Sequence, residues 1–320
     1  MEYAKLGHSN IEVSRLCVGC MSFGDAASNF HQWTLGADES EVMIKHALDL
    51  GINFFDTANI YSAGTSEEYV GRGIKNTIAR DKVVLATKVF FNEGKLSKEA
   101  IHREIEGSLR RLGTDYVDLY IIHRFDASTP MEETMEALDS LVRSGKVRAL
   151  GASAMYGYQF QNMQQVAKDN GFTPFTSMQN HYNLMYREDE RELIPICQQQ
   201  KVALTPYSPL AAGRLSRLEW HTDTKRSQTD KTAVSKYDSN ETSDYQIVQR
   251  VDELAQKYSA TMTQIALAWH FAKGVTSPII GATKTKYFDD SVGALNIKLT
   301  SEEVTYLEEL YLPHKIVGAL

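Results

Sequence analysis

The chain alternates short apolar runs of strand length with segments of helical period along almost its whole length. The apolar runs predict eight strands, at residues 15–19, 52–56, 83–88, 117–123, 147–153, 175–180, 202–208 and 277–281. Between them, in segments such as 39–50, 97–112 and 131–145, apolar residues recur three and four positions apart, which is typical of amphipathic helices. Strands separated in this way favour one α/β domain over residues 1–320, a (β/α)8 barrel, rather than a doubly wound open sheet.

Two local features refine this prediction. Lys5, Leu6 and Gly7, followed by SNIEV, predict a short hairpin before the first strand. No strand is followed by G-x-G-x-x-G, so a Rossmann dinucleotide site is unsupported. Gly71-Arg72-Gly73 looks superficially similar, but it lies within a helical segment, which disfavours a phosphate loop.

Composition excludes several classes of function. A formal charge of −7 argues against a surface that binds nucleic acid or anionic membrane. The first residues lack a basic stretch followed by an apolar one, so we expect a cytoplasmic protein without a secretory signal. The cysteines are odd in number and give no disulfide framework: Cys17, Cys20 and Cys197. The C-x-x-C pair of Cys17 and Cys20 is better explained as two small buried side chains than as a redox pair. We expect no metal site.

An acid, a phenol, an amine and an imidazole each close or follow an apolar run. Asp56 ends the second run, Tyr61 lies five residues later, and Lys88 and His123 end the third and fourth. Residues at the carboxyl ends of barrel strands converge on one face, so we expect a single site. The charge of Lys88 would lower the pKa of the phenol, Asp56 would hold Lys88, and His123 would orient a substrate oxygen. This set suits carbonyl reduction with Tyr61 as general acid, and the alternative is a structural network of buried polar groups.

These residues resemble the aldo-keto reductase family over nearly the whole chain, from RLCVGCMSFG to PIIGATKTKYFDDSVGAL. The motifs DTANIY, ATKV, IIHR, ALGAS, MQNHYNL and YSPLAAGRL stand in that family's order. DTANIYSAGTSEE, GASAMYGYQF and HYNLMYREDERE are similar to a bacterial and fungal branch related to potassium-channel β subunits. The resemblance implies an NADP(H)-dependent barrel that acts on a small carbonyl or alcohol substrate, with Asp56, Tyr61, Lys88 and His123 as the catalytic set.

The same resemblance implies a set of cofactor residues. Tyr207 would stack on the nicotinamide, and Ser153 and Gln179 would hydrogen-bond its carboxamide. The nicotinamide ribose would be lined by Gly19, Cys20 and Met21, and the pyrophosphate would lie along Ser208, Leu210, Gly213 and Arg214. After the eighth strand the expected residues are Gly281, Thr283, Lys284 and Asp290. Lys284, with Lys286 in support, would hold the 2′-phosphate of NADP at a helix N-terminus, and Asp290 would lie near the adenine.

The chain departs from the family's pattern at two of these places. Ala154 stands where many members have Asn, which removes one amide contact that Asn180 or backbone would have to replace. Ser291 stands where the usual residue is Asn, which weakens an adenine contact.

Aromatic residues are the candidates for the substrate pocket. Trp33, in the loop after the first strand, and Phe90, close after Lys88, are the expected walls, with Tyr156 and Trp220 as further candidates. They favour an apolar or aromatic aldehyde or ketone, and the alternative for each is plain packing. The sequence leaves open the physiological substrate, the direction of reaction and the oligomeric state, including a homo-oligomer.

From about Ser216 to Tyr245 the chain is polar and has no sustained period. Its composition predicts a long loop after the seventh strand that does not order by itself and that closes over bound cofactor, anchored by Trp220 and Tyr237. The alternative is a passive surface insertion. We expect trypsin to cleave it rapidly without cofactor, at Arg217, Lys225, Arg226, Lys231 and Lys236.

Two other functions compete with the reductase. Lys88 could be the Schiff-base nucleophile of a barrel aldolase, but the neighbouring acid and phenol and the phosphate-ready helix after the eighth strand argue against it. The chain could also be a subunit that senses a cofactor and binds a partner with little turnover, and the four catalytic-type residues do not exclude this.

Overall fold

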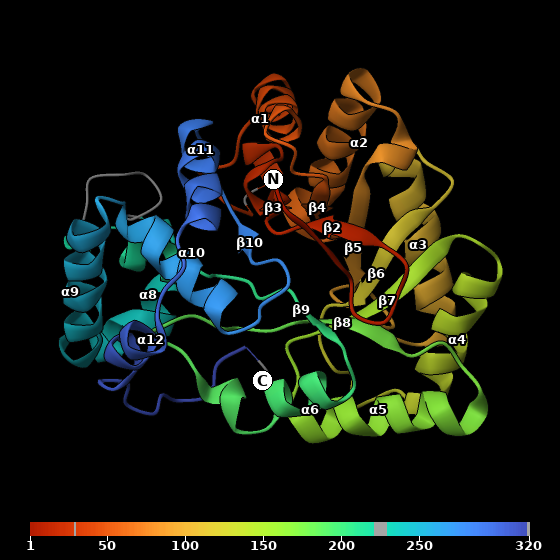
Figure 1. Cartoon of the computed structure of the whole chain (residues 1–320). Helices are drawn as coiled ribbons and strands as arrows, with labels where there is room; N and C mark the ends of the chain where they lie inside the picture. The colour runs from red at the N-terminus through yellow and green to blue at the C-terminus, as the bar shows by residue number, and fades with distance from the viewer. Residues whose placement is uncertain (29, 221–228, 319–320) are drawn as a thin grey trace.

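The computed structural model describes residues 1–28, 30–220 and 229–318, and at its centre lies one sheet of eight parallel strands (Figure 1). Strands that follow one another in the chain pair in the sheet, in the order β10-β3-β4-β5-β6-β7-β8-β9. Their bounds are β3 Cys17–Gly19, β4 Phe54–Asp56, β5 Val84–Val89, β6 Val117–Ile122, β7 Val147–Ser153, β8 Phe175–Gln179, β9 Ala203–Leu204 and β10 Ile279–Ile280.

Backbone hydrogen bonds also join the two ends of this order. The amide of Thr276 donates to the carbonyl oxygen of Leu204 at 3.0 Å, and the amide of Ile279 donates to that of Pro206 at 2.9 Å. These bonds close the sheet into a barrel, which leaves no unpaired edge. The predicted (β/α)8 architecture is therefore confirmed, while a single domain over residues 1–320 stays a prediction.

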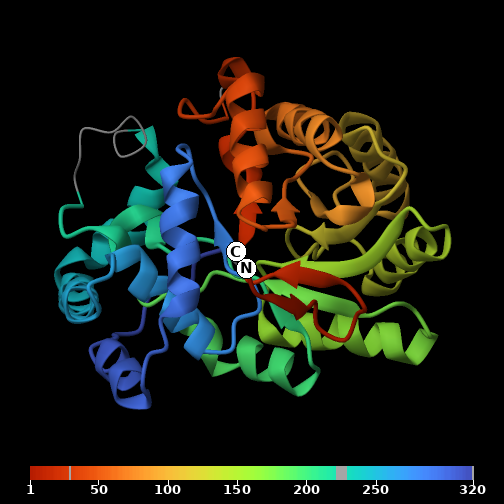
Figure 2. The same ribbon diagram turned by 45° about the horizontal axis from the view of Figure 1, so that its top comes forward.

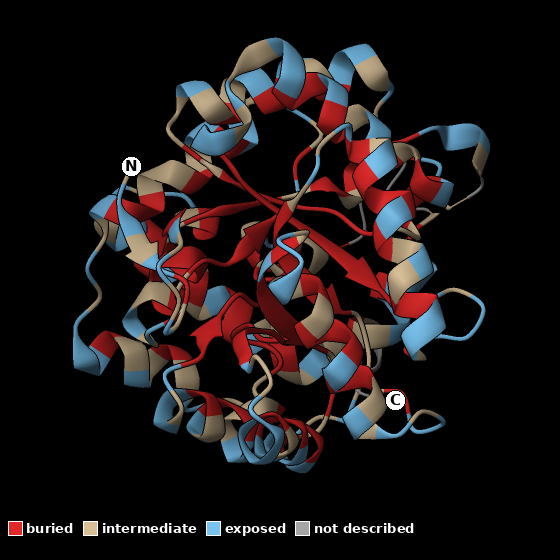
Figure 3. Ribbon diagram, turned by 90° about the vertical axis from the view of Figure 1, so that its right-hand side faces the viewer, coloured by how far each residue is buried: buried red, intermediate tan, exposed pale blue. Residues whose placement is uncertain are grey.

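Helices surround the barrel and turn their apolar faces towards it, so that burial concentrates at the centre and exposure on the outward faces (Figure 3). Their bounds are α1 Ala37–Asp49, α2 Thr65–Thr77, α3 Lys98–Leu112, α4 Met131–Arg143, α5 Gly157–Asn170, α6 Leu193–Gln199, α8 Lys231–Tyr237, α9 Glu241–Tyr258, α10 Met262–Ala272, α11 Lys286–Gly293 and α12 Ser301–Glu308. Within the described ranges, no helix has both the length and the apolar character that crossing a bilayer requires.

The predicted N-terminal hairpin is present and lies across one end of the barrel (Figure 2). Its strands are β1 Tyr3–Lys5 and β2 Glu12–Ser14, and Leu6 and Val13 pack with the side chains inside the barrel. Gly7 has a φ of +59°, and a Cβ there would lie 2.2 Å from the carbonyl oxygen of Thr176. Only glycine fits this close approach.

The polar segment from Ser216 to Tyr245 is largely helical where it is described, so the expectation of an irregular loop is wrong for residues 230–245, while its closure over bound cofactor stays a prediction. It contains α8 and the first residues of α9, and Asp230 caps α8 by accepting a hydrogen bond from the amide of Ala233. The side chains of Tyr237 and Trp220 are buried, so a few aromatic residues supply the burial that the average composition hides. Lys225 and Arg226 lie outside the described residues.

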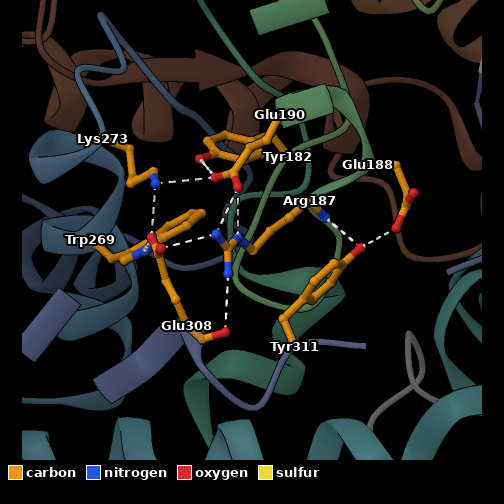
Figure 4. A network of polar contacts seen from close by, with 8 residues as sticks. All are labelled: Tyr182, Arg187, Glu188, Glu190, Trp269, Lys273, Glu308 and Tyr311. Carbon is orange, nitrogen blue, oxygen red and sulfur yellow. Dashed lines mark hydrogen bonds and ion pairs between the residues drawn. The ribbon is translucent and has the colours of Figure 1, made fainter. Parts of the chain in front are cut away.

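After α12 a network of charged and aromatic residues fixes the end of the chain to the segment that follows β8 (Figure 4). The guanidinium of Arg187 contacts Glu190 at 2.7 Å and Glu308 at 2.9 Å. Tyr311 receives the amide N–H of Arg187 at 3.0 Å and donates its own hydroxyl to Glu188 at 2.6 Å. These contacts direct the C-terminal residues back over the barrel.

Candidate active site

Lys88 is the centre of the site, because all three of its N–H groups have partners. Its side chain is 0% exposed, and Nζ donates to Asp56 Oδ2 at 2.6 Å, to the carbonyl oxygen of Thr57 at 2.7 Å and to Tyr61 Oη at 3.1 Å. An ammonium has only three N–H groups, so its donors are fully used. Tyr61 Oη therefore accepts from Lys88, and its own O–H proton is left to point elsewhere.

Tyr61 opens a short turn whose backbone is strained. The next two residues, Ser62 and Ala63, have φ angles of 47° and 54°, and Gly64 follows at 93°. Non-glycine residues in this left-handed region cluster at functional sites, where the surrounding structure holds them. In the described part of the chain, six of nine such residues are predicted site residues or lie within two positions of one: Ser62, Ala63, Ala154, Ser208, Ala211 and Ala212.

Burial decides whether the phenol of Tyr61 is ionised. It raises the pKa of Tyr61 above its ordinary value, and the nearby Lys88 charge lowers the pKa by less. The predicted lowering of the Tyr61 pKa by Lys88 is present, but burial outweighs it, so the net pKa is raised and the phenol stays protonated at neutral pH. Burial also lowers the pKa of Lys88, but Asp56 and Tyr61 more than offset this and keep the ammonium charged.

His123 follows β6 and faces the phenol. Its ring lies edge-on to that of Tyr61, with centroids 5.8 Å apart. Burial, and then the charges of Lys88 and Arg124, lower the pKa of His123 well below its ordinary value, so the imidazole is neutral. Its Nδ1 is buried and has no hydrogen-bond partner among the described residues. The structure thus brings all four predicted catalytic-type residues together.

Ser153 and Gln179, the expected carboxamide residues, end the adjacent strands β7 and β8 and lie opposite each other in register. Gln179 Nε2 also donates to Asp56 Oδ1 at 3.0 Å. Ala154 has a φ of 45°, a conformation that Asn adopts more readily than Ala.

Tyr207 lies just past β9, with one ring face against His181. The two rings are parallel within 6°, with centroids 5.2 Å apart, and the Nζ of Lys236 lies 4.8 Å from the Tyr207 centroid. Ser208 has a φ of 54°, and Gly213 one of 94°. Ala211 and Ala212 are also left-handed, with φ angles of 48° and 55°, and backbone of this kind can present its N–H groups to an anion. The guanidinium of Arg214 is paired with Asp238 and lies over the rings of Trp220 and Tyr237.

The other predicted cofactor residues lie at two places on the rim. Gly19 ends β3, Cys20 is fully buried and Met21 is half-buried, so any contact through Cys20 is a backbone contact. All three cysteines are free and buried, and burial raises the pKa of both Cys17 and Cys20, which disfavours a redox pair.

The second place is the segment between β10 and α11. A Cβ on Gly281 would meet nothing within 4 Å, Thr283 is half-buried, and Lys284 and Lys286 are exposed. Asp290 accepts a hydrogen bond from Thr261 at 2.8 Å, and the buried Ser291 donates to the carbonyl oxygen of Tyr287.

Different aromatic residues from those predicted lie beside the phenol and the imidazole. Trp33 stacks on His31, and Phe90 packs at the edge of the core, whereas Phe30 lies 5.9 Å from Tyr61 and Phe91 lies 5.1 Å from His123 between ring centroids. Phe90 was predicted from its position close after Lys88. However, β5 ends at Val89, and the turn that follows brings Phe91 to His123.

The C-terminal residues complete one wall of the rim, which the sequence did not reveal. Tyr186 Oη exchanges hydrogen bonds with both backbone groups of Val317, at 3.0 and 3.2 Å, and Arg124 donates to the carbonyl oxygen of Gly318. A cavity of about 130 Å³ lies between this end and the barrel, and its lining includes Ala154, Tyr156, Asn180, His181, Tyr207 and Gly318.

The chain is similar to known proteins over almost its whole length. A family model described as the aldo/keto reductase family matches residues 15–312. Versiconal hemiacetal acetate reductase of Aspergillus parasiticus is 41% identical over 341 residues, covering 99% of this chain and 98% of that protein. A Schizosaccharomyces pombe protein provisionally named as an aryl-alcohol dehydrogenase is 42% identical over 350 residues, covering 99% and 98%. A thermostable aldo-keto reductase, solved with the inhibitor epalrestat, superposes with a TM-score of 0.79 at 29% identity, covering 97% of this chain and 100% of that one.

Proposed function

Because the chain belongs to the aldo/keto reductase family, we propose that it reduces aldehydes or ketones to alcohols with NADPH, reversibly, and that Tyr61 is the general acid. The observation that carries this proposal is the set of three hydrogen bonds from Lys88, because they leave the Tyr61 proton free for a substrate.

The rim of the barrel fits a nicotinamide cofactor. Tyr207 would stack on the nicotinamide through the ring face opposite His181, Ser153 and Gln179 would offer paired hydrogen-bonding groups, and the backbone around the left-handed residues Ser208, Ala211, Ala212 and Gly213 would offer N–H groups to the pyrophosphate. When bound, the cofactor supplies a hydride to the carbonyl carbon. Lys284 would hold the 2′-phosphate, with Gly281, Thr283 and Asp290 nearby.

The residues of the chain then perform the proton chemistry. Tyr61 donates its O–H proton to the carbonyl oxygen, and the phenolate that remains is stabilised by the Lys88 ammonium 3.1 Å away. Asp56 holds that ammonium in place, and water later returns a proton to the phenolate. His123, neutral, orients the carbonyl oxygen by donating one N–H.

The rings around Tyr61 support an apolar or aromatic substrate. Phe30 and Phe91 offer aromatic edges and faces beside the two groups that would contact the carbonyl oxygen. The similarity to a protein provisionally named as an aryl-alcohol dehydrogenase supports the same substrate class.

A panel of aromatic and aliphatic carbonyls, followed by the absorbance of NADPH, tests the proposal. We expect turnover to be fastest with aromatic aldehydes, and Tyr61→Phe to lower kcat about 10²–10⁴-fold while NADPH still binds. Retention of more than about half of kcat would remove Tyr61 from its role. Binding of NADPH without turnover of any carbonyl would favour the cofactor-sensing subunit instead.

A further inference from the structure

Asp56 makes a second contact that is separate from its ion pair with Lys88. Lys88 contacts Oδ2 at 2.6 Å, and Gln179 donates its Nε2–H to Oδ1 at 3.0 Å. The side chains are 3% and 4% exposed, so neither oxygen is open to bulk water. One carboxylate thus links residues from the ends of β4, β5 and β8.

This contact fixes which way round the Gln179 amide lies. A primary amide can present either its NH₂ or its oxygen to a neighbour, and the two orientations differ by a half-turn. As the partner of an ammonium, Asp56 is a carboxylate, which only accepts hydrogen bonds. The NH₂ of Gln179 must therefore face Asp56, and Oε1 lies on the other side of the amide, where no described residue hydrogen-bonds to it.

We propose that Asp56 is a positioning residue for the cofactor as well as a partner of Lys88. By holding the NH₂ of Gln179, it makes Oε1 an acceptor that recognises the N–H of the nicotinamide carboxamide. The proposal rests on the proposed function, because it takes NADP(H) as the ligand with its carboxamide at Ser153 and Gln179.

Two further features of the chain make the orientation of the Gln179 amide important for binding the cofactor. Ala154 has no amide, so the position beside Ser153 offers no side-chain hydrogen bond to the carboxamide. The contacts also form one continuous series, from Gln179 through Asp56 and Lys88 to Tyr61. Recognition of the cofactor and support of the proton donor therefore share one carboxylate.

A cofactor analogue can test the orientation without any turnover. The 3-acetylpyridine analogue of NADP⁺ has a methyl group where the carboxamide has its NH₂, so it offers an oxygen but no N–H. We measure the Kd of NADP⁺ and of this analogue by quenching of tryptophan fluorescence. For the wild-type protein we expect the analogue to bind about tenfold more weakly, since it leaves Oε1 of Gln179 without a donor.

Variants of Asp56 and Gln179 then identify the cause of this difference, expressed as the ratio of the Kd of the analogue to the Kd of NADP⁺. In Asp56→Asn the new NH₂ can donate to Gln179 Oε1. The Gln179 amide can then rotate by a half-turn and offer its own NH₂ to the acetyl oxygen of the analogue. We expect the ratio to fall to within about twofold, with NADP⁺ itself bound more weakly. Gln179→Met removes the contact and should abolish the ratio as well. Tyr61→Phe, which leaves the contact between Asp56 and Gln179 intact, should keep the ratio near tenfold.

Each outcome decides the proposal. Equal affinities in the wild type, or a tenfold ratio retained in Asp56→Asn, would overturn it. If circular dichroism shows that Asp56→Asn is unfolded, Asp56→Ala replaces it, because it removes the same acceptor. If NADP⁺ does not bind the wild-type protein at all, the proposed cofactor is wrong, and that result differs from a failure of the orientation.

Discussion

At the scale of single residues, burial sets the chemistry of the site more strongly than the nearest charge does. Tyr61 lies 3.1 Å from an ammonium, yet burial leaves its pKa above the ordinary value. The same burial makes His123 neutral. Lys88 therefore serves to hold a phenol that is protonated before the reaction and to stabilise the charge that appears during it.

Replacing Lys88 by Met should impair both activity and stability. The variant leaves the buried Asp56 without its ion-pair partner, which we expect to lower the free energy of unfolding by about 3–5 kcal/mol. The pKa of Tyr61 should rise further, because the group that lowers it is gone, so kcat should fall and its pH profile should shift. Urea unfolding and the pH dependence of kcat measure both effects. Lys45→Met, at an exposed pair, should change stability by less than about 0.5 kcal/mol. An unshifted pH profile would contradict the coupling of Lys88 to Tyr61.

Replacing Ala154 by Asn should raise the stability of the fold and tighten the binding of NADPH. The residue has a φ of 45°, where Asn is less strained than Ala, so we expect the free energy of unfolding to rise by up to about 1 kcal/mol. Ala154 directly follows Ser153 in the chain and lines the cavity, so the new amide should tighten NADPH binding by about fivefold. Thermal unfolding and fluorescence titration measure the two effects. Ala154→Leu, which adds bulk without an amide, is the control and should not tighten binding.

At the scale of elements, the functional groups lie on segments that follow strands and that other parts of the chain hold in place. The C-terminal residues form one such segment, since contacts with the segment after β8 and with α9 bring them to the rim. The residues from the end of β10 to the start of α11 form another, and they include Lys284 and Lys286, the lysines proposed to select the cofactor.

Docking of the C-terminal residues should depend on the charge of His314. Its Nδ1 faces the carbonyl oxygen of Leu312 at 2.7 Å and its Nε2 faces Asp244 at 2.9 Å, and both partners only accept. Both ring nitrogens must therefore carry hydrogen, as in the imidazolium. Burial lowers the pKa of His314, but Asp244, the carbonyl group of Leu312 and Glu188 together raise it more, so the net pKa lies above the ordinary value. Burial also raises the pKa of Asp244.

The sign of the pH dependence follows from these directions. A group with a raised folded-state pKa contributes its full stability below its unfolded pKa, about 6.5 for His, and loses it as the pH rises through the folded value. We expect hydrogen exchange in residues 312–318, corrected for its intrinsic pH dependence, to accelerate as the pH rises above about 6.5. His314→Gln should exchange fast at every pH. Equal protection across this range in the wild type would show that the imidazolium does not hold the segment.

Replacing Lys284 by Ala should change the preference between cofactors. The side chain is exposed beside the start of α11, and a charge-assisted contact to a phosphate contributes about 1.5–3 kcal/mol. NADPH should bind one to two decades more weakly, while NADH, which lacks the 2′-phosphate, should be nearly unaffected. Titration of both cofactors measures the difference, with Lys298→Ala on an exposed loop as the control. Equal losses for both, or none for either, would refute the assignment.

At the scale of the whole molecule, the barrel depends on close packing of its outer helices. Gly71 and Gly73, which resemble a phosphate loop only in spacing, lie buried in α2. A Cβ on Gly71 would lie 2.3 Å from the carbonyl oxygen of Leu112 at the end of α3. Glycine is needed there because it lets two helices approach, which explains the motif without a ligand.

Replacing Gly71 by Ala should destabilise the fold. Alanine favours a helix by about 1 kcal/mol over glycine, but the contact with backbone cannot relax without moving a helix. We therefore expect the free energy of unfolding to fall by about 1–3 kcal/mol, measured by urea unfolding. In the matched variant Gly73→Ala the new Cβ would meet the end of the flexible Ile44 side chain, so the loss should be smaller. A gain in stability for Gly71→Ala would contradict this packing.

The sequence by itself determined the parts of this protein that depend on local pattern. Eight apolar runs and the helical periods between them predicted the strand order and the barrel, since burial on both sides of a strand is recorded in its own residues. The position of Asp56, Lys88 and His123 at strand ends predicted that they meet, because the carboxyl ends of parallel strands share one face.

Only the tertiary structure decided what depends on contacts between distant residues. The net direction of the Tyr61 pKa follows from burial by many segments, which no single motif records. Residues 230–245 order because Tyr237 is buried against remote residues, including His181, although the segment is polar on average. Phe91 reaches His123, and Gly318 reaches the rim, because the chain turns and returns there. Such contacts are set by the path of the whole chain, and no stretch of sequence contains them.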